Sequence, residues 1–122
     1  MKKYFIVIAA ATVIAACGSN ETKQAPGTEQ TTDISSNPDY QKGLALIAKS
    51  DCLTCHKVSE KLVGPAYKDV AKKYTEKDIT TLAEKVIKGG QGNWGAIPMQ
   101  PHPTLSQADA EQMVKYILLL KN

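Results

Sequence analysis

Apolar residues recur at helical spacing in several stretches of the second part of the chain. Over residues 39–50, Leu44, Ile47 and Ala48 fall on one face, because positions three and four apart share a face of a helix. The same periodicity returns over residues 78–88 and 106–118, and a shorter helix is expected over residues 66–74. No window alternates apolar and polar residues as a strand does. The pattern therefore predicts an all-α fold of three to five short helices.

Capping residues and helix breakers mark where these helices begin and end. Asn37 followed by Pro38 predicts the start of the first helix, and Ser106 with Asp109 resembles a capping box for the last one. Gly89 predicts the end of the helix over residues 78–88. The following stretch, residues 89–103, contains four Gly and three Pro and is predicted to be a long loop.

The first segment of the chain has a different pattern, which predicts an export signal. Lys2 and Lys3 precede an uncharged apolar run that reaches Ala16. That run is shorter than the roughly 20 residues that a membrane-spanning helix needs. The stretch Ile14-Ala15-Ala16-Cys17 resembles the lipobox of bacterial lipoproteins, which implies a signal peptide over residues 1–16 and a lipidated Cys17. The alternative is an ordinary secretory signal with a chance cysteine beside it.

The polar segment after Cys17 predicts a flexible linker over residues 17–37. It consists mostly of Ser, Asn, Glu, Thr, Gln, Gly and Pro, with Ile34 as its one large aliphatic residue. Such a composition buries too little apolar surface to offset the entropy of ordering. A coil of this length reaches roughly 25 Å. Residues 38–122 are then the folded domain.

Composition limits what this domain can do. The chain has 122 residues, a net charge of +3 and only 6% aromatic residues. The small net charge and the absence of arginine argue against nucleic-acid binding. So few aromatic residues leave little side-chain volume to fill a core. Either the domain is only marginally stable, or a group other than protein fills part of its interior.

The string Cys52-Leu53-Thr54-Cys55-His56 carries the chemistry. C-x-x-C-H is the signature of covalent c-type haem attachment, in which two thiols meet the vinyl groups of the porphyrin and the histidine points at the iron. Three other interpretations compete with it. A thioredoxin-like redox pair needs a βαβ context that is missing here, and a plain disulfide leaves His56 unexplained. A zinc site would have to combine the two cysteines and His56 with His102, although Cys55 and His56 are adjacent.

A second axial ligand is expected for a haem in an electron carrier, and the candidates are Met99, His102 and Met113. Met113 lies on the apolar stripe of the last helix and is interpreted as core. His102, between two prolines, is predicted to be exposed. Met99 lies in the Gly- and Pro-rich loop, where a thioether can be held in place, and is the predicted ligand.

With these motifs in view, the chain resembles the class I c-type cytochromes, most closely the bacterial c-551/c-552 type, as a lipoprotein. The resemblance covers residues 38–122. It rests on the haem motif and on three further runs: Val63-Gly64-Pro65, Gly92-Asn93-Trp94-Gly95-Ala96-Ile97-Pro98-Met99 and Val114-Lys115-Tyr116-Ile117. It implies thioether bonds from Cys52 and Cys55 to one haem c, and His56 and Met99 as axial ligands of the iron.

The resemblance implies further roles as well. The carbonyl of Pro65 would accept a hydrogen bond from His56, and Trp94 would lie near a haem propionate. Gly43 and Tyr116 would meet where the first and last helices cross. One departure is Gln100, which stands where many relatives carry a proline, so the loop is expected to be slightly less rigid there.

The function implied is electron transfer by ferrous/ferric cycling, without enzymatic activity or a small-molecule substrate. The partners would be a redox donor and acceptor, together with the membrane through the lipid anchor, and the protein would be a monomer. It would lie outside the cytoplasm, on the outer face of the cytoplasmic membrane or on the outer membrane facing the periplasm. Lysines near the haem edge are candidates for steering acidic partners: Lys57, Lys61, Lys72, Lys73 and Lys88. The alternatives are a haem subunit of a larger oxidoreductase and a peroxidase-like or ligand-sensing haem protein.

Overall fold

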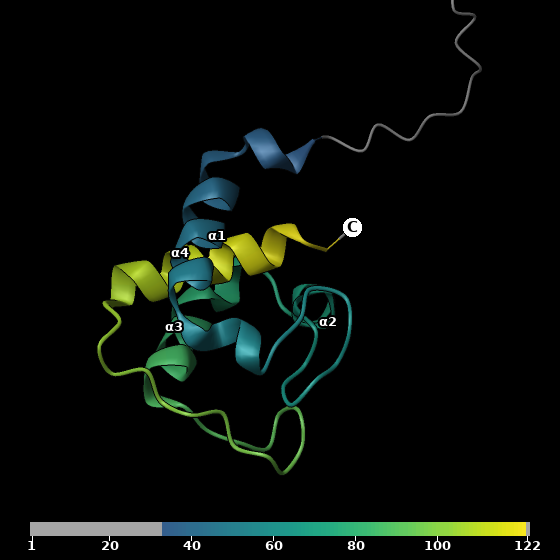
Figure 1. The fold of residues 1–122 in the computed structure, drawn as a ribbon, viewed down its shortest axis with the longest axis vertical. Coiled ribbons are helices and arrows are strands. Elements are labelled where there is room, and N and C mark those ends of the chain that lie inside the picture. Colours follow the sequence, from purple (N-terminus) through teal and green to yellow (C-terminus); the bar gives the residue numbers. More distant parts are fainter. Residues whose placement is uncertain (1–32, 122) are drawn as a thin grey trace, which may run out of the picture. The chain divides into compact units, whose positions relative to one another are not determined.

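The computed structural model describes residues 33–121, and within that range the domain is helical (Figure 1). The predicted all-α fold is confirmed. The α-helices are α1 (Pro38–Lys49), α2 (Tyr67–Lys73), α3 (Ile79–Lys88) and α4 (Gln107–Leu119), and short 3-10 helices occur at η1 (Ile34–Ser36), η2 (Asp51–Thr54) and η3 (Glu76–Asp78). The predicted signal over residues 1–16 and the predicted lipidation site at Cys17 lie outside the described residues.

The helix ends form where the capping residues predicted them. The Asn37 side-chain oxygen accepts a hydrogen bond from the backbone N–H of Asp39 at 2.8 Å, and α1 starts there. The Ser106 hydroxyl accepts from the N–H of Asp109 at 3.1 Å at the start of α4. Gly89 ends α3 with φ of +72°, a conformation that glycine adopts without steric cost. Local side-chain chemistry thus sets the boundaries of the helices between which the cysteine turn and the methionine segment lie.

Helix α4 organises the domain, because α1, α2 and α3 all pack against it (Figure 1). One buried cluster lies between α1, α2 and α4 and includes Ile47, Tyr67, Met113, Tyr116 and Leu120. A second lies between α3 and α4 and is made of Ala83, Ala110 and Val114. The prediction that Met113 belongs to the core is confirmed, since it is 2% exposed.

The end of the predicted linker is ordered in the structure. Residues 34–36 form η1, which is capped by Asp33, whose carboxylate accepts a hydrogen bond from the N–H of Ser35 at 3.0 Å. Ile34 packs against the first buried cluster, and the side chain of Gln41 donates to the carbonyl of Ser35 at 3.1 Å. The described residues just before Pro38 therefore pack on the domain, because the single large aliphatic residue of this segment finds an apolar contact.

None of the helices in residues 33–121 is long and apolar enough to cross a membrane.

Candidate functional site

The cysteine motif lies on the tight turn that follows α1. Cys52 is in η2, and Cys55 is the residue that ends it. The carbonyl of Cys52 accepts hydrogen bonds from the N–H of Cys55 at 3.2 Å and from the N–H of His56 at 3.0 Å. Both cysteines are half-buried free thiols. These two hydrogen bonds close the backbone into a turn that holds Cys52, Cys55 and His56 near one another.

The imidazole of His56 is anchored through one of its nitrogens. Nδ1 lies 2.8 Å from the carbonyl oxygen of Pro65. A carbonyl only accepts, so Nδ1 carries the proton and the lone pair of Nε2 is left to bind a metal. The contact holds because Gly64 donates its N–H to the carbonyl of Cys55 at 2.8 Å, which folds this segment back over the motif. The hydrogen bond that the family resemblance implied for Pro65 is present.

Gly64 belongs to the Val63-Gly64-Pro65 run that carries the resemblance, but the sequence gave it no role of its own. A Cβ atom at this position would overlap the His56 ring and would lie 2.8 Å from both of its nitrogens. The backbone therefore approaches the imidazole more closely than any residue with a side chain allows. In the sequence, a glycine before a proline indicates only that a helix or strand is interrupted there. The close approach of the backbone to the His56 ring becomes visible only in the structure.

Met99 lies near the end of the long segment between α3 and α4. Its N–H donates to the carbonyl of Gly90 at 2.9 Å, and the N–H of Gly90 donates back to the carbonyl of Met99 at 3.1 Å. This antiparallel bridge closes the intervening residues into a loop and holds the half-buried methionine at its base. Among residues 33–121 no hydrogen bond or ring contact joins Met99 to His56, so their ligation of one iron stays a prediction.

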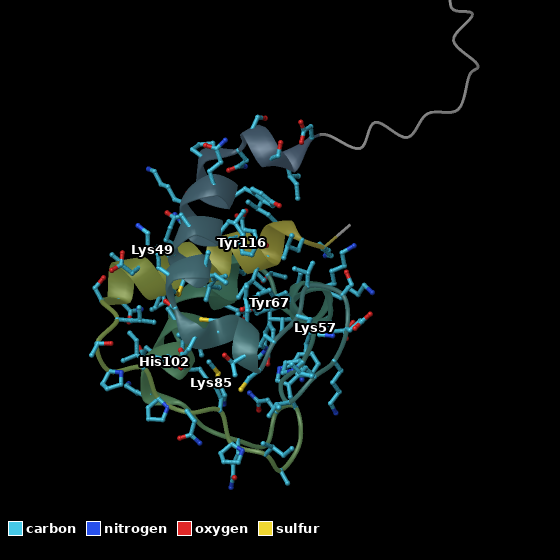
Figure 2. All side chains as sticks on the ribbon, viewed as in Figure 1. Lys49, Lys57, Tyr67, Lys85, His102 and Tyr116 are labelled. Atoms are coloured by element: carbon cyan, nitrogen blue, oxygen red, sulfur yellow. The ribbon has the colours of Figure 1, made fainter. Side chains whose placement is uncertain are left out.

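His102 corrects one expectation. Its side chain was predicted to be exposed but is only 20% accessible. Its Nε2 lies 3.1 Å from a carboxylate oxygen of Asp51, and its Nδ1 lies 3.3 Å from the carbonyl of Val86. Figure 2 shows the ring turned toward the domain from the long segment. The neighbouring prolines suggested a loop on the surface, yet the backbone N–H of His102 is bonded to the carbonyl end of α3, which turns the ring inward.

Trp94 lies in the loop that the bridge between Gly90 and Met99 closes, and it is 37% exposed. The ammonium group of Lys73 lies 4.6 Å from the centre of the indole ring, a cation–π distance, and also 3.3 Å from the carbonyl of Asn93. The ring of Tyr74 meets the indole edge at a centroid distance of 6.4 Å. These contacts hold the tip of the loop onto the end of α2.

The distribution of apolar side chains bears on whether this domain fits a haem. Only ten apolar residues are buried in the described part of the chain, and four of them are alanines. Of the seven large apolar side chains that are exposed in the described residues, five belong to the segments around the cysteine motif or just before Met99: Leu53, Val58, Leu62, Val63 and Ile97. A small core beside an exposed apolar surface fits a domain built around an apolar group. The free thiols and the unpaired Nε2 fit a haem in particular.

The competing interpretations of the cysteine motif find little support. Burial, and after it the nearby carboxylate of Asp51, raises the pKa of the Cys52 thiol above its ordinary value. Redox-active cysteines of the thioredoxin kind have a lowered pKa, and the direction at Cys52 is the opposite. Within residues 33–121 no three His, Cys, Asp or Glu side chains come together as a metal site, which leaves the zinc alternative without its ligand set.

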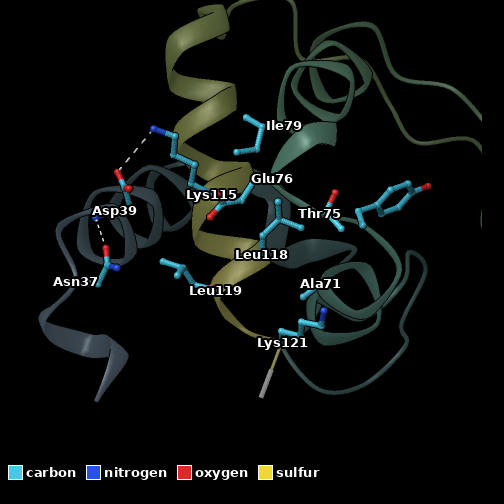
Figure 3. Close-up of a pocket in the computed structure, with 11 residues that line it drawn as sticks. Asn37, Asp39, Ala71, Thr75, Glu76, Ile79, Lys115, Leu118, Leu119 and Lys121 are labelled. Atoms are coloured by element: carbon cyan, nitrogen blue, oxygen red, sulfur yellow. Dashed lines mark hydrogen bonds and ion pairs between the residues drawn. The ribbon is translucent and has the colours of Figure 1, made fainter. Parts of the chain in front are cut away.

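One groove of the described domain lies away from this motif. Its volume is about 540 Å³, and it is bordered by the start of α1, the turn after α2 and the end of α4 (Figure 3). Asp39 and Lys115 face each other across its rim at 4.0 Å. No residue of the predicted haem site lines it. The candidate site is therefore defined by the cysteine turn and the methionine segment, not by this groove.

Three of the five lysines proposed for steering are paired with acidic neighbours. Lys57 contacts Glu60 at 3.1 Å, Lys88 contacts Glu84 at 2.9 Å, and Lys72 lies 3.9 Å from Asp69. Lys73 is engaged with Trp94. Pairing reduces the field that these lysines project toward a partner.

Comparison with known proteins gives consistent results. The family model described as cytochrome c matches residues 40–121. A cytochrome c-552 from Nitrosomonas europaea is 49% identical over 78 residues, covering 62% of this chain and 76% of the relative. A cytochrome c-551 from Allochromatium vinosum is 45% identical over 83 residues, covering 66% of this chain and 88% of the relative.

Solved structures agree with the sequence relatives. The crystal structure of wild-type Nitrosomonas europaea cytochrome c552 superposes with a TM-score of 0.59 at 47% identity, covering 63% of this chain and 98% of the other. The class 1 cytochrome MtoD from Sideroxydans lithotrophicus superposes with a TM-score of 0.54 at 26% identity, covering 67% of this chain and 96% of the other.

Proposed function

The chain belongs to the cytochrome c family, and from this premise we propose that it is an exported, membrane-tethered electron carrier whose single haem is held by Cys52, Cys55, His56 and Met99. As a class I c-type cytochrome it binds one covalently attached haem c and transfers electrons. Three things are proposed beyond membership of the family: which residues hold the haem, how the protein is tethered to a membrane, and what surface its redox partners contact.

One observation carries the assignment of His56 as the proximal ligand. Its Nδ1 is committed to the carbonyl of Pro65 at 2.8 Å, so the free lone pair is on Nε2. The hydrogen bond fixes the tautomer and increases the basicity of the ligating nitrogen. His56 directly follows Cys55, so a haem bound through the two thiols would lie against this same imidazole.

Met99 is proposed as the second axial ligand. Its segment is pinned at Gly90 and again at His102, so the thioether sits on backbone that is held at both sides. A bound haem supplies the redox-active iron, and thioether ligation with burial raises its reduction potential. If His56 and Met99 both held the iron, no position would be left for a substrate, and the protein would then be a carrier, in contrast to the peroxidase-like alternative.

The surface proposed for partner contact is the one that presents the exposed apolar side chains of the cysteine turn, of the segment after it and of the residues before Met99: Leu53, Val58, Leu62, Val63 and Ile97. A haem would cover part of it, and its exposed edge would lie among the remainder. Encounters between redox proteins bury small areas, and a patch of modest apolar side chains suits brief docking. Because Lys57, Lys72 and Lys88 are ion-paired, we expect only a weak contribution of charge steering.

Export and tethering are proposed from the sequence of residues 1–17. Lys2 and Lys3, the apolar run and Cys17 support cleavage before Cys17 and its lipidation. Two or more acyl chains hold a protein firmly at a membrane, whereas a single one is marginal. The site would be the outer face of the cytoplasmic membrane or the outer membrane facing the periplasm, and the polar segment before η1 would give the domain lateral reach.

The test of the haem site is the absorption spectrum of the purified ferric protein. Native protein is expected to show a sulfur-to-iron charge-transfer band, which Met99→Ala abolishes and Met113→Ala keeps. Absence of the band from the native protein would overturn His/Met ligation. Cys52→Ser with Cys55→Ser is expected to abolish covalent attachment, seen as loss of the haem mass from the denatured chain.

The test of the tether is mass analysis of the mature N-terminus after extraction with mild detergent. The expected chain starts at Cys17 and carries acyl chains, and Cys17→Ser releases the domain from the membrane fraction. A mature chain that starts elsewhere, or an unmodified Cys17, contradicts the tether but leaves the haem assignment intact. Proteins that copurify with the native form would distinguish a free carrier from a subunit of a larger oxidoreductase.

A further inference from the structure

The ring of Tyr67 lies on the ring of His56. The two ring centres are 5.4 Å apart and the planes differ by 21°, which is an offset stack. Tyr67 is the first residue of α2 and is only 3% exposed. Neither the cysteine motif nor the methionine segment includes it, so it is an additional neighbour of the imidazole.

The hydrogen bond to Pro65 leaves part of the His56 geometry undetermined. A single hydrogen bond fixes one atom of a ring, here Nδ1, and leaves the tilt of the plane about that contact free. An aromatic ring stacked on the imidazole restricts this tilt, because turning the plane would break the stack or drive one ring into the other. Gly64 adds a second restriction, since its backbone already lies close to the imidazole.

Tyr67 can serve as a fixed reference because it is itself held from several sides. Its N–H donates to the carbonyl of Lys57 at 2.9 Å, which ties the start of α2 to the residue after His56. Its ring meets that of Tyr116 edge-on, with centres 6.5 Å apart and planes at 89°. Tyr116 in turn packs against Gly43 of α1 and against the ring of Tyr40, 5.0 Å away. Figure 2 shows Tyr116 on α4 beside the crossing with α1, and Tyr67 below it.

We propose that Tyr67 is a positioning residue that sets the plane of the His56 imidazole and connects it mechanically to the crossing of α1 and α4. The inference rests on the proposed ligation of the haem iron by His56. The stacked ring, not the phenol hydroxyl, carries the effect, because the observed contact is between ring planes. The orientation of an axial imidazole decides which iron d orbitals its π system overlaps, and it therefore shapes the magnetic anisotropy of the ferric protein.

The experiment compares Tyr67→Phe with Tyr67→Leu in the haem-loaded protein. The readouts are the NMR shifts of the haem methyl protons and the EPR g values of the ferric form, together with the reduction potential. Tyr67→Phe keeps the ring and is expected to give the native order and spread of methyl shifts. Tyr67→Leu removes the ring and is expected to change both, while the sulfur-to-iron band is retained. If Tyr67→Leu does not accumulate, Tyr67→Met is the second variant without a ring.

A matched control separates positioning from general loss of stability. Val114→Ala removes buried volume from the cluster between α3 and α4, of which Tyr67 is not a member. It is expected to lower the melting temperature and leave the methyl shifts unchanged. The inference is overturned if Tyr67→Leu keeps the native shifts, if Tyr67→Phe changes them as much as Tyr67→Leu, or if Val114→Ala changes them equally. Failure of the proposed function is distinguishable, because the native protein would then lack the sulfur-to-iron band.

Discussion

Gly43 of α1 lies against Tyr116 of α4 so closely that a methyl group on Gly43 would overlap the Cβ of the tyrosine. It would also lie 2.6 Å from the carbonyl of Gln112, and backbone of the facing helix cannot move aside as a flexible side chain can. This contact, expected from the family resemblance, sets the distance between the two helices. The same tyrosine contacts Tyr67, so the crossing is connected to the neighbourhood of His56.

Gly43→Ala is therefore expected to destabilise the domain even though alanine is the better helix former. The gain in helix propensity is up to about 1 kcal/mol, whereas forcing an extra methyl into a packed contact costs about 1–3 kcal/mol, and more where backbone must move. Urea unfolding of the haem-loaded protein measures the net loss. Lys42→Ala, on the exposed side of the same helix, is the control and is expected to stay within about 0.5 kcal/mol. Equal stability of Gly43→Ala and the native chain would contradict the close contact.

A second prediction concerns Gly64, whose backbone approaches the His56 ring. Gly64→Ala would place a methyl group 2.8 Å from both ring nitrogens, so the imidazole must shift and lengthen its hydrogen bond to Pro65. We expect a changed reduction potential and a loss of about 1–3 kcal/mol in unfolding free energy. Pro65→Ala is the matched comparison, because it keeps the carbonyl that accepts the hydrogen bond. A Gly64→Ala protein with native potential and native stability would refute the steric interpretation.

The helices were predictable because their signals are local. Apolar spacing, the side chain of Asn37, the Ser106 cap and Gly89 act within one or two turns of the chain, and each helix forms where they placed it. The hydrogen bond from His56 to Pro65 was also anticipated, through the family resemblance, and it is present.

The remaining contacts of the site depend on which segments meet in space. Nothing near Tyr67 in sequence indicates that its ring stacks on His56, because the turn at Gly64 and Pro65 brings the two together. His102 contacts Asp51, which is 51 positions away, so local composition could not reveal that its ring is covered. Ile34 likewise packs against the first buried cluster, and its polar neighbours in the sequence do not indicate this contact.

A third prediction uses the buried phenol of Tyr116. Burial, with a smaller contribution from nearby Tyr40, raises the pKa of Tyr116 above its ordinary value of 10.0. The folded protein thus holds this proton more tightly than the unfolded chain, and the resulting stability is complete below pH 10 and is lost as the pH rises through the folded-state pKa. Tyr116→Phe removes this share, so its unfolding free energy should decline less steeply above pH 10 than that of the native protein. Urea unfolding at stepped pH measures the two slopes.

The behaviour of the same variant near neutral pH is the internal control for that experiment. Between pH 7 and 9 the difference in unfolding free energy between Tyr116→Phe and the native protein should be constant, because the phenol is protonated in both folded and unfolded chains. Parallel curves that continue above pH 10 would show that Tyr116 does not contribute to the alkaline loss of stability.

The last prediction concerns the contact between His102 and Asp51, which ties the segment of Met99 to the turn of Cys52. The imidazole reaches the carboxylate at 3.1 Å and the end of α3 at 3.3 Å, while the backbone N–H of His102 is bonded to α3 independently of the side chain. His102→Ala should therefore loosen the methionine segment without releasing it. Polar contacts with exposed carboxylates contribute about 0.2–1 kcal/mol, which corresponds to a roughly 1.5- to 5-fold change in an opening equilibrium. If Met99 is an axial ligand, cyanide should bind the ferric variant faster by that factor, measured by stopped-flow absorbance.

Two further variants serve as controls for the His102→Ala result. Asp51→Asn should give a smaller acceleration, because an amide oxygen still accepts a hydrogen bond. Asp69→Asn, which alters only the contact with Lys72, should give none. Native cyanide kinetics in His102→Ala would show that the backbone bonds alone hold the segment.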